Sequence, residues 1–61
     1  MWIKTRDNVF YNTDHASAIL YSTKSKSTQL YVNSNIINIA NYDCTEQIMT
    51  GIQRGSNYME V

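Results

Sequence analysis

The stretch Asp43 to Gly55, DCTEQIMTGIQRG, is the part of the chain whose pattern most clearly predicts a helix. Asp43 can cap the first free backbone N–H groups, and Glu46, three residues later, completes the pattern of a capping box. Ile48 and Ile52 recur four residues apart and give a narrow apolar stripe. Gly55 stands where a left-handed cap is favoured. We therefore expect one helix, which covers a face of the structure that precedes it.

The residues before this helix are typical of short strands separated by polar turns. The pair Asp7-Asn8 and the run Ser22 to Ser27 predict hairpin turns. The predicted strands cover residues 2–6, 9–12, 16–22, 28–33 and 36–40. The tail, residues 56–61, is expected to lie extended and could cross to a neighbouring chain. The sequence thus predicts a single α+β domain over residues 1–61, an antiparallel meander of four to five strands with one C-terminal helix packed on one face.

Side-chain alternation divides the predicted sheet into two faces. The face expected under the helix carries Ile3, Val9, Leu20, Leu30, Ile37 and Ile39. The opposite face is also apolar, and its candidate interface residues are Trp2, Phe10, Ile19, Tyr21, Tyr31 and Ile36. Because one short helix covers only one face, we expect the second face to bind another copy or a partner protein. A homodimer with sheets face to face, or paired at an edge, satisfies this requirement.

Composition excludes several classes of protein. The chain has 61 residues, five basic and five acidic side chains, and a formal net charge of zero, which argues against strong non-specific nucleic-acid binding. Cys44 is the only cysteine, so no internal disulfide forms, and no cluster of metal ligands is visible. We expect no metal and no cofactor. The start of the chain lacks the pattern of a signal peptide, and no apolar run reaches the ~20 residues of a membrane span, so we expect a cytoplasmic location without a membrane.

Two residue types with catalytic potential occur alone. Asp14 and His15 are adjacent and offer an acid–base pair, or else a polar turn with an exposed imidazole. Cys44 falls at the start of the predicted helix, where a thiol is either activated by the helix dipole or simply packed as a small side chain. Neither residue has a partner base or nucleophile at a useful spacing. We therefore assign no catalytic residue and expect a protein that is not an enzyme.

The cations suggest a second kind of binding. If the first hairpin and the turn at residues 22–27 lie side by side, Arg6, Lys24 and Lys26 would form a candidate anion-binding rim. Trp2 and Tyr31, with Tyr21, could then stack on bases. Single-stranded nucleic acid or nucleotide binding is therefore the alternative to protein binding as a homo-oligomer.

The order of these features resembles a group of small, mostly uncharacterised sheet-plus-helix proteins of Gram-positive bacteria and their phages. The likeness lies in the Met1-Trp2-Ile3 start before a polar turn, in Tyr42-Asp43-x-x-Glu46 at the helix start, and in the ending Gly55-Ser56-Asn57-Tyr58-Met59. The resemblance implies a sheet-plus-helix fold and brings no established chemistry. Together with the second apolar face, it motivates the hypothesis of a phage-encoded inhibitor of a bacterial defence system that binds a host protein.

Overall fold

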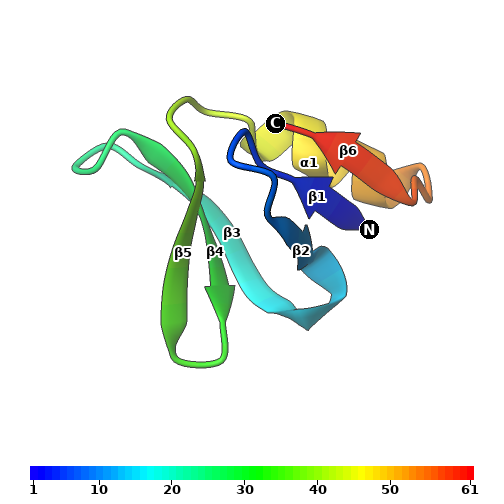
Figure 1. Cartoon of the computed structure of the whole chain (residues 1–61), viewed down its shortest axis with the longest axis horizontal. Coiled ribbons are helices and arrows are strands. Elements are labelled where there is room, and N and C mark those ends of the chain that lie inside the picture. Colours follow the sequence, from blue (N-terminus) through cyan, green and yellow to red (C-terminus); the bar gives the residue numbers. More distant parts are fainter.

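Two three-stranded sheets and one α-helix make up the fold (Figure 1). The computed structural model describes residues 1–61, and its elements in chain order are β1 (Trp2–Lys4), β2 (Phe10–Asn12), the 3-10 helix η1 (Thr13–His15), β3 (Ala16–Ser22), β4 (Ser27–Val32), β5 (Asn35–Ala40), α1 (Thr45–Gln53) and β6 (Tyr58–Glu60). The first sheet has the strand order β2-β1-β6, and the second has the order β3-β4-β5. All neighbouring strands are antiparallel except β1 and β6.

The prediction of an α+β domain with one helix is confirmed, but the predicted strand count and topology are wrong. The chain forms six strands in two sheets rather than one meander of four to five, and α1 is followed by a strand. The tail is extended, as predicted, and β6 pairs with β1 of the same chain and sets Met59 opposite Ile3. The helix returns the chain along the first sheet, so the next strand runs parallel to β1, as a crossover connection allows.

The helix begins later than its sequence pattern predicts. Cys44 occupies the N-cap position and makes no side-chain cap, so the predicted capping box of Asp43 and Glu46 is wrong. Asp43 instead accepts hydrogen bonds at Oδ1 from the hydroxyl of Thr45 at 2.7 Å and from its backbone N–H at 3.1 Å. These two bonds, the hydroxyl bond first, lower the pKa of Asp43. The Asp43 carboxylate therefore binds the backbone N–H of the first helical residue, Thr45, from the position before the N-cap.

The end of the helix agrees with its sequence. Gly55 adopts a φ of 73°, which is the left-handed conformation predicted there. Ile48 is fully buried, while Ile52 remains 39% exposed and Met49 is exposed as well. Ile48 is thus the one buried side chain of α1, and the other side chains of the helix are at least partly exposed.

The core lies between the two sheets and α1 and is small. Its buried hydrophobic members are Ile3, Leu30, Ile39, Cys44 and Ile48. A buried hydroxyl joins the second sheet to the start of α1, because Thr28 Oγ1 donates to the carbonyl of Tyr42 at 2.6 Å and accepts from the N–H of Cys44 at 3.1 Å. One threonine side chain therefore positions the segment that leads into the helix.

The predicted faces of β3 are reversed in the structure. Ile19 and Tyr21 pair with the fully buried Leu30 and Thr28, so these two candidate interface residues lie on the inner face of the second sheet. Leu20, predicted under the helix, instead pairs with Gln29 on the outer face. The cause is a register shift between Ala16 and Ala18, since one extra residue in a strand moves every following side chain to the other face. Val9, also predicted under the helix, precedes β2 and is exposed.

Candidate functional site

Three aromatic side chains lie next to one another on the outer face of the first sheet. Trp2 is directly opposite Tyr58, and Phe10 is opposite Lys4, so all four share one face. The aromatic side chains are 49% (Trp2), 53% (Phe10) and 47% (Tyr58) exposed. The rings of Phe10 and Tyr58 approach to 6.5 Å between centroids. We call Trp2, Phe10 and Tyr58 the aromatic face, and a contiguous exposed patch of this kind is typical of an interaction surface.

Two opposite charges accompany the aromatic face. Lys4 and Glu60 are direct neighbours across β1 and β6, and they lie on the same outer surface. Partial burial raises the pKa of the Tyr58 phenol, and the adjacent Glu60 raises it further through a hydrogen bond and its negative charge. The phenol of Tyr58 therefore lies beside the carboxylate of Glu60. The aromatic face combines apolar surface with both signs of charge.

The aromatic face continues into a groove against the second sheet. This groove has a volume of about 320 Å³ and is lined on one side by Trp2, Phe10 and His15, and on the other by Val32 and Ile37. His15 is exposed at its rim. The neighbouring Asp14 carboxylate binds the amino group of Met1 at 3.3 Å, so it does not orient the imidazole. The structure brings no acid–base pair together here.

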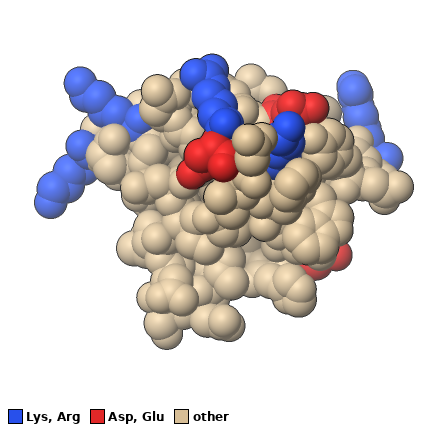
Figure 2. All heavy atoms as spheres, in the orientation of Figure 1, with Lys and Arg blue, Asp and Glu red and all other residues tan.

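The outer face of the second sheet is a separate surface. Tyr31 and Ile36 are directly opposite each other on it, and Ile36 is 57% exposed. Figure 2 shows most of the charged side chains in the upper part of the molecule and an acidic one lower on the right, while the surface over the lower ends of β4 and β5 carries none. The sequence alone indicates this uncharged surface, because no charged residue occurs from Ser27 to Tyr42. The six predicted interface residues are therefore divided among three surfaces.

The candidate anion-binding residues are only partly brought together. Arg6 and Asp7 line a cavity of about 420 Å³, and Ser25 from the turn between β3 and β4 and Ser27 at the start of β4 line it too, so the two hairpins face the same cavity. The guanidinium of Arg6 also lies 5.8 Å from the centre of the Tyr42 ring.

Lys24 and Lys26 are exposed in that same turn but do not line the cavity. The predicted stacking set is not assembled, because Trp2 lies on the first sheet, Tyr21 on the inner face of the second and Tyr31 on its outer face.

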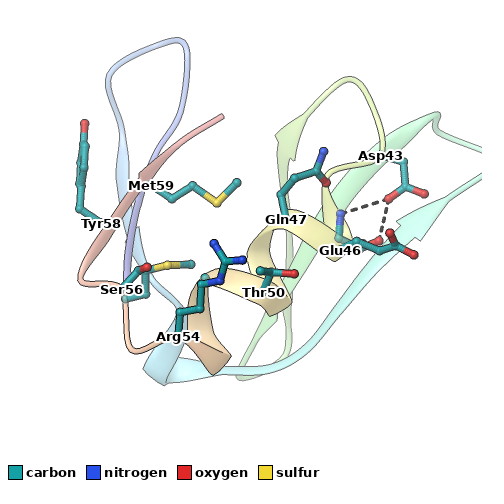
Figure 3. A pocket seen from close by; sticks show the side chains of 11 residues that line it. Asp43, Glu46, Gln47, Thr50, Arg54, Ser56, Tyr58 and Met59 are labelled. Carbon is teal, nitrogen blue, oxygen red and sulfur yellow. Dashed lines mark hydrogen bonds between the residues drawn. The ribbon is translucent and has the colours of Figure 1, made fainter.

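The largest cavity is a groove between α1 and β6, of about 850 Å³ (Figure 3). Its helix wall presents Asp43, Glu46, Gln47, Thr50 and Arg54, and its strand wall presents Ser56, Tyr58 and Met59. Gly51 allows the close approach of Met1, since a Cβ there would lie 3.0 Å from the methionine sulfur. Sequence reasoning missed this groove because it assigned no strand to the tail. Gly51 in the helix was the one available signal.

No known protein family, curated protein or solved structure matches the chain. The resemblance to small proteins of Gram-positive bacteria and their phages stays a prediction. None of the helices combines the length and apolar character required to cross a bilayer. Cys44 is free and buried, which agrees with a packed side chain at the helix start.

Proposed function

We propose that this chain is a non-catalytic binding protein that acts as a homo-oligomer, with the aromatic face as its interface. The observation that carries the proposal is the clustering of Trp2, Phe10 and Tyr58 on one side of the first sheet. About half of each ring is exposed, which corresponds to about 300 Å² of aromatic surface in total. At ~25 cal/mol per Å², covering this surface is worth about as much as the stability of a small domain.

The charges on the same surface favour a second copy as the partner. A two-fold dimer brings the same patch of both subunits together, so each patch must complement itself. Lys4 and Glu60 carry opposite charges on neighbouring strands of the aromatic face. In a face-to-face dimer, the lysine of each copy can pair with the glutamate of the other, which sets the orientation of the two sheets.

Substituting Phe10→Ser should weaken self-association at least tenfold, because it removes the most exposed ring of the aromatic face. Sedimentation equilibrium over a micromolar concentration series measures the dissociation constant, and circular dichroism checks that the variant is folded. The matched control is Ile36→Ser, which removes an equally exposed side chain from the outer face of the second sheet. A monomer at every concentration, or an equal effect of the control, would contradict the proposal.

A phage-encoded inhibitor of a host defence protein would require only an exposed surface that binds its target. The motivation for this hypothesis is the resemblance of the two chain ends described above, together with the exposed apolar side chains. A dimer could present the outer faces of both second sheets to a host partner. This part of the proposal stays a prediction.

A second candidate, the binding of single-stranded nucleic acid or a nucleotide, is supported by the cavity that holds Arg6, Ser25 and Ser27. Arg6 and the hydroxyl groups of Ser25 and Ser27 line this cavity together with Asp7, and the guanidinium is the group there that suits a phosphate. Lys24 and Lys26 lie in the adjoining turn.

If this function holds, a labelled oligothymidine should bind with an affinity that falls as salt rises, and Arg6→Gln should reduce the slope of that dependence by about one. Arg54→Gln, at the other groove, is the control. An absence of binding at low salt would exclude the candidate.

A further inference from the structure

We infer that the groove between α1 and β6 docks an extended segment of another protein, which pairs with the free edge of β6 as a fourth strand of the first sheet. This interaction uses the free edge of β6 and the wall of α1, and of the aromatic face it shares only Tyr58, so it goes beyond the proposed oligomer and does not depend on it. Strand addition at an open sheet edge gains its affinity from backbone hydrogen bonds, and neighbouring side chains determine which sequence is accepted.

The backbone of β6 has one edge without a partner. Toward β1, the carbonyl of Asn57 accepts from the N–H of Trp2 at 2.9 Å, and the N–H of Val61 donates to the carbonyl of Lys4 at 3.0 Å. Successive residues of a strand direct their backbone groups to opposite edges. The N–H and C=O groups of Tyr58 and Glu60 therefore point away from β1, where the strand order ends. They form an open template for another strand.

The groove runs along this open edge. Tyr58 and Met59 are consecutive and project to opposite faces of the sheet, yet both line the groove. A cavity that touches both must follow the edge of the strand. Figure 3 shows α1 as the opposite wall, with the side chains of Met59 and Arg54 directed into the space between helix and strand. The volume of about 850 Å³ is within the range of sites that enclose a ligand.

The helix wall of the groove carries opposite charges at its two ends, Glu46 at one and Arg54 at the other. α1 and β6 run in opposite directions (Figure 1), and the N–H of Ser56 donates to the carbonyl of Gly51 at 2.9 Å where the helix ends and the chain turns back. Arg54 therefore lies at the Tyr58 end of β6, and Glu46 lies toward the Glu60 end. The one ion pair of the structure joins Met1 and Asp14, so neither Arg54 nor Glu46 has an oppositely charged partner.

The spacing of these two charges defines the segment that fits. Glu46 and Arg54 are eight residues apart on the helix side, which is about 12 Å of helix axis and about four residues of extended strand. Residues four apart in a strand face the same side. We take the partner as a segment antiparallel to β6, which then carries a Lys or Arg opposite Glu46 and an Asp or Glu four residues later opposite Arg54. The β6 strand of a second copy offers one carboxylate and no cation, so it does not fit.

A pair of short peptides tests the charge pattern. Fluorescein-labelled Lys-Thr-Val-Thr-Glu, acetylated and amidated, should bind in an anisotropy titration about tenfold more tightly than the reversed Glu-Thr-Val-Thr-Lys. The double variant Glu46→Lys with Arg54→Glu should invert this preference, while Phe10→Ser should leave it unchanged. Equal binding of both peptides to the unchanged protein, or no binding at millimolar concentration, would overturn the inference. Because the readout is peptide affinity, it is independent of whether the proposed dimer forms.

Backbone methylation tests strand addition itself. Two versions of the binding peptide carry N-methyl groups on alternate residues, and only one of these patterns removes the N–H groups that face β6. One version should lose binding, and the other should retain it within about twofold. Hydrogen exchange at the amides of Tyr58 and Glu60 should slow when the peptide is added. Equal effects of both methylation patterns, or slow exchange that depends on protein concentration without peptide, would contradict docking of a foreign segment.

Discussion

Replacing Thr28 with valine should lower the free energy of unfolding by about 2–4 kcal/mol, because the change removes the partner of the buried Cys44 N–H and that of the Tyr42 carbonyl. Thr28 is fully buried, and its hydroxyl serves both the Tyr42 carbonyl and the Cys44 N–H. Valine has nearly the same shape, so the packing changes little while both hydrogen bonds disappear. A domain of this size has a total stability on the order of 3–9 kcal/mol. The variant should therefore be close to unfolding at room temperature.

Urea denaturation followed by circular dichroism measures this loss. Thr50→Val is the matched control, since Thr50 is exposed on α1 and its side chain makes no hydrogen bond within the protein. The control should change the free energy of unfolding by no more than about 0.5 kcal/mol. If Thr28→Val also changed the free energy of unfolding by no more than about 0.5 kcal/mol, the Thr28 hydroxyl would not be the group that holds β4 to the start of the helix.

Truncating Ile48 to alanine should cost about 2–5 kcal/mol, as expected for a large core side chain that leaves a cavity. Ile48 is the only hydrophobic residue of α1 that is fully buried, and it packs in the same cluster as Ile3 and Leu30. The better helix propensity of alanine offsets only a few tenths of a kcal/mol. With so few core residues, no other contact can replace it.

Thermal unfolding of Ile48→Ala and Ile52→Ala side by side provides the comparison. Ile52 has the same chemistry four residues later but is 39% exposed, so its truncation should cost less than about 1 kcal/mol. Similar losses for both variants would mean that α1 packs through a broader face than the structure shows.

The sequence predicted those elements whose signals are local and long enough to read. The strand at residues 16–22 coincides with β3, and Gly55 ends the helix in the left-handed conformation, as its position predicts. Ile48 was correctly placed at the helix–sheet contact. These features depend on periodicity and turn chemistry, which neighbouring residues determine by themselves.

The division into two sheets was not predictable in the same way. β1 and β2 lie within the predicted strands at residues 2–6 and 9–12, whereas β6 has only three residues, too few for alternation to identify a strand. The pairing of Trp2 with Tyr58 joins distant parts of the chain, and no local pattern encodes it. Likewise, the register shift in β3 exchanged the faces of Ile19 and Leu20.

The candidate surfaces also depend on pairing between distant parts of the chain. Trp2 and Phe10 were assigned to an exposed apolar face from the sequence, whereas Tyr58 joins them only through the non-local pairing of β6. The groove beside α1 exists only once β6 is in place, so the sequence alone could not reveal it. The separation of Tyr31 and Ile36 onto another sheet has the same origin.

The parallel pairing of β1 with β6 also affects how the protein is made. β1 is translated well before β6, yet its central position in the first sheet requires β6 as a neighbour. Until β6 is translated, β1 and β2 form a two-stranded ribbon, which is at best marginally stable. Folding is therefore completed after synthesis has reached Glu60. A nascent chain that stalls earlier would expose Ile3 and become a substrate for chaperones and proteases.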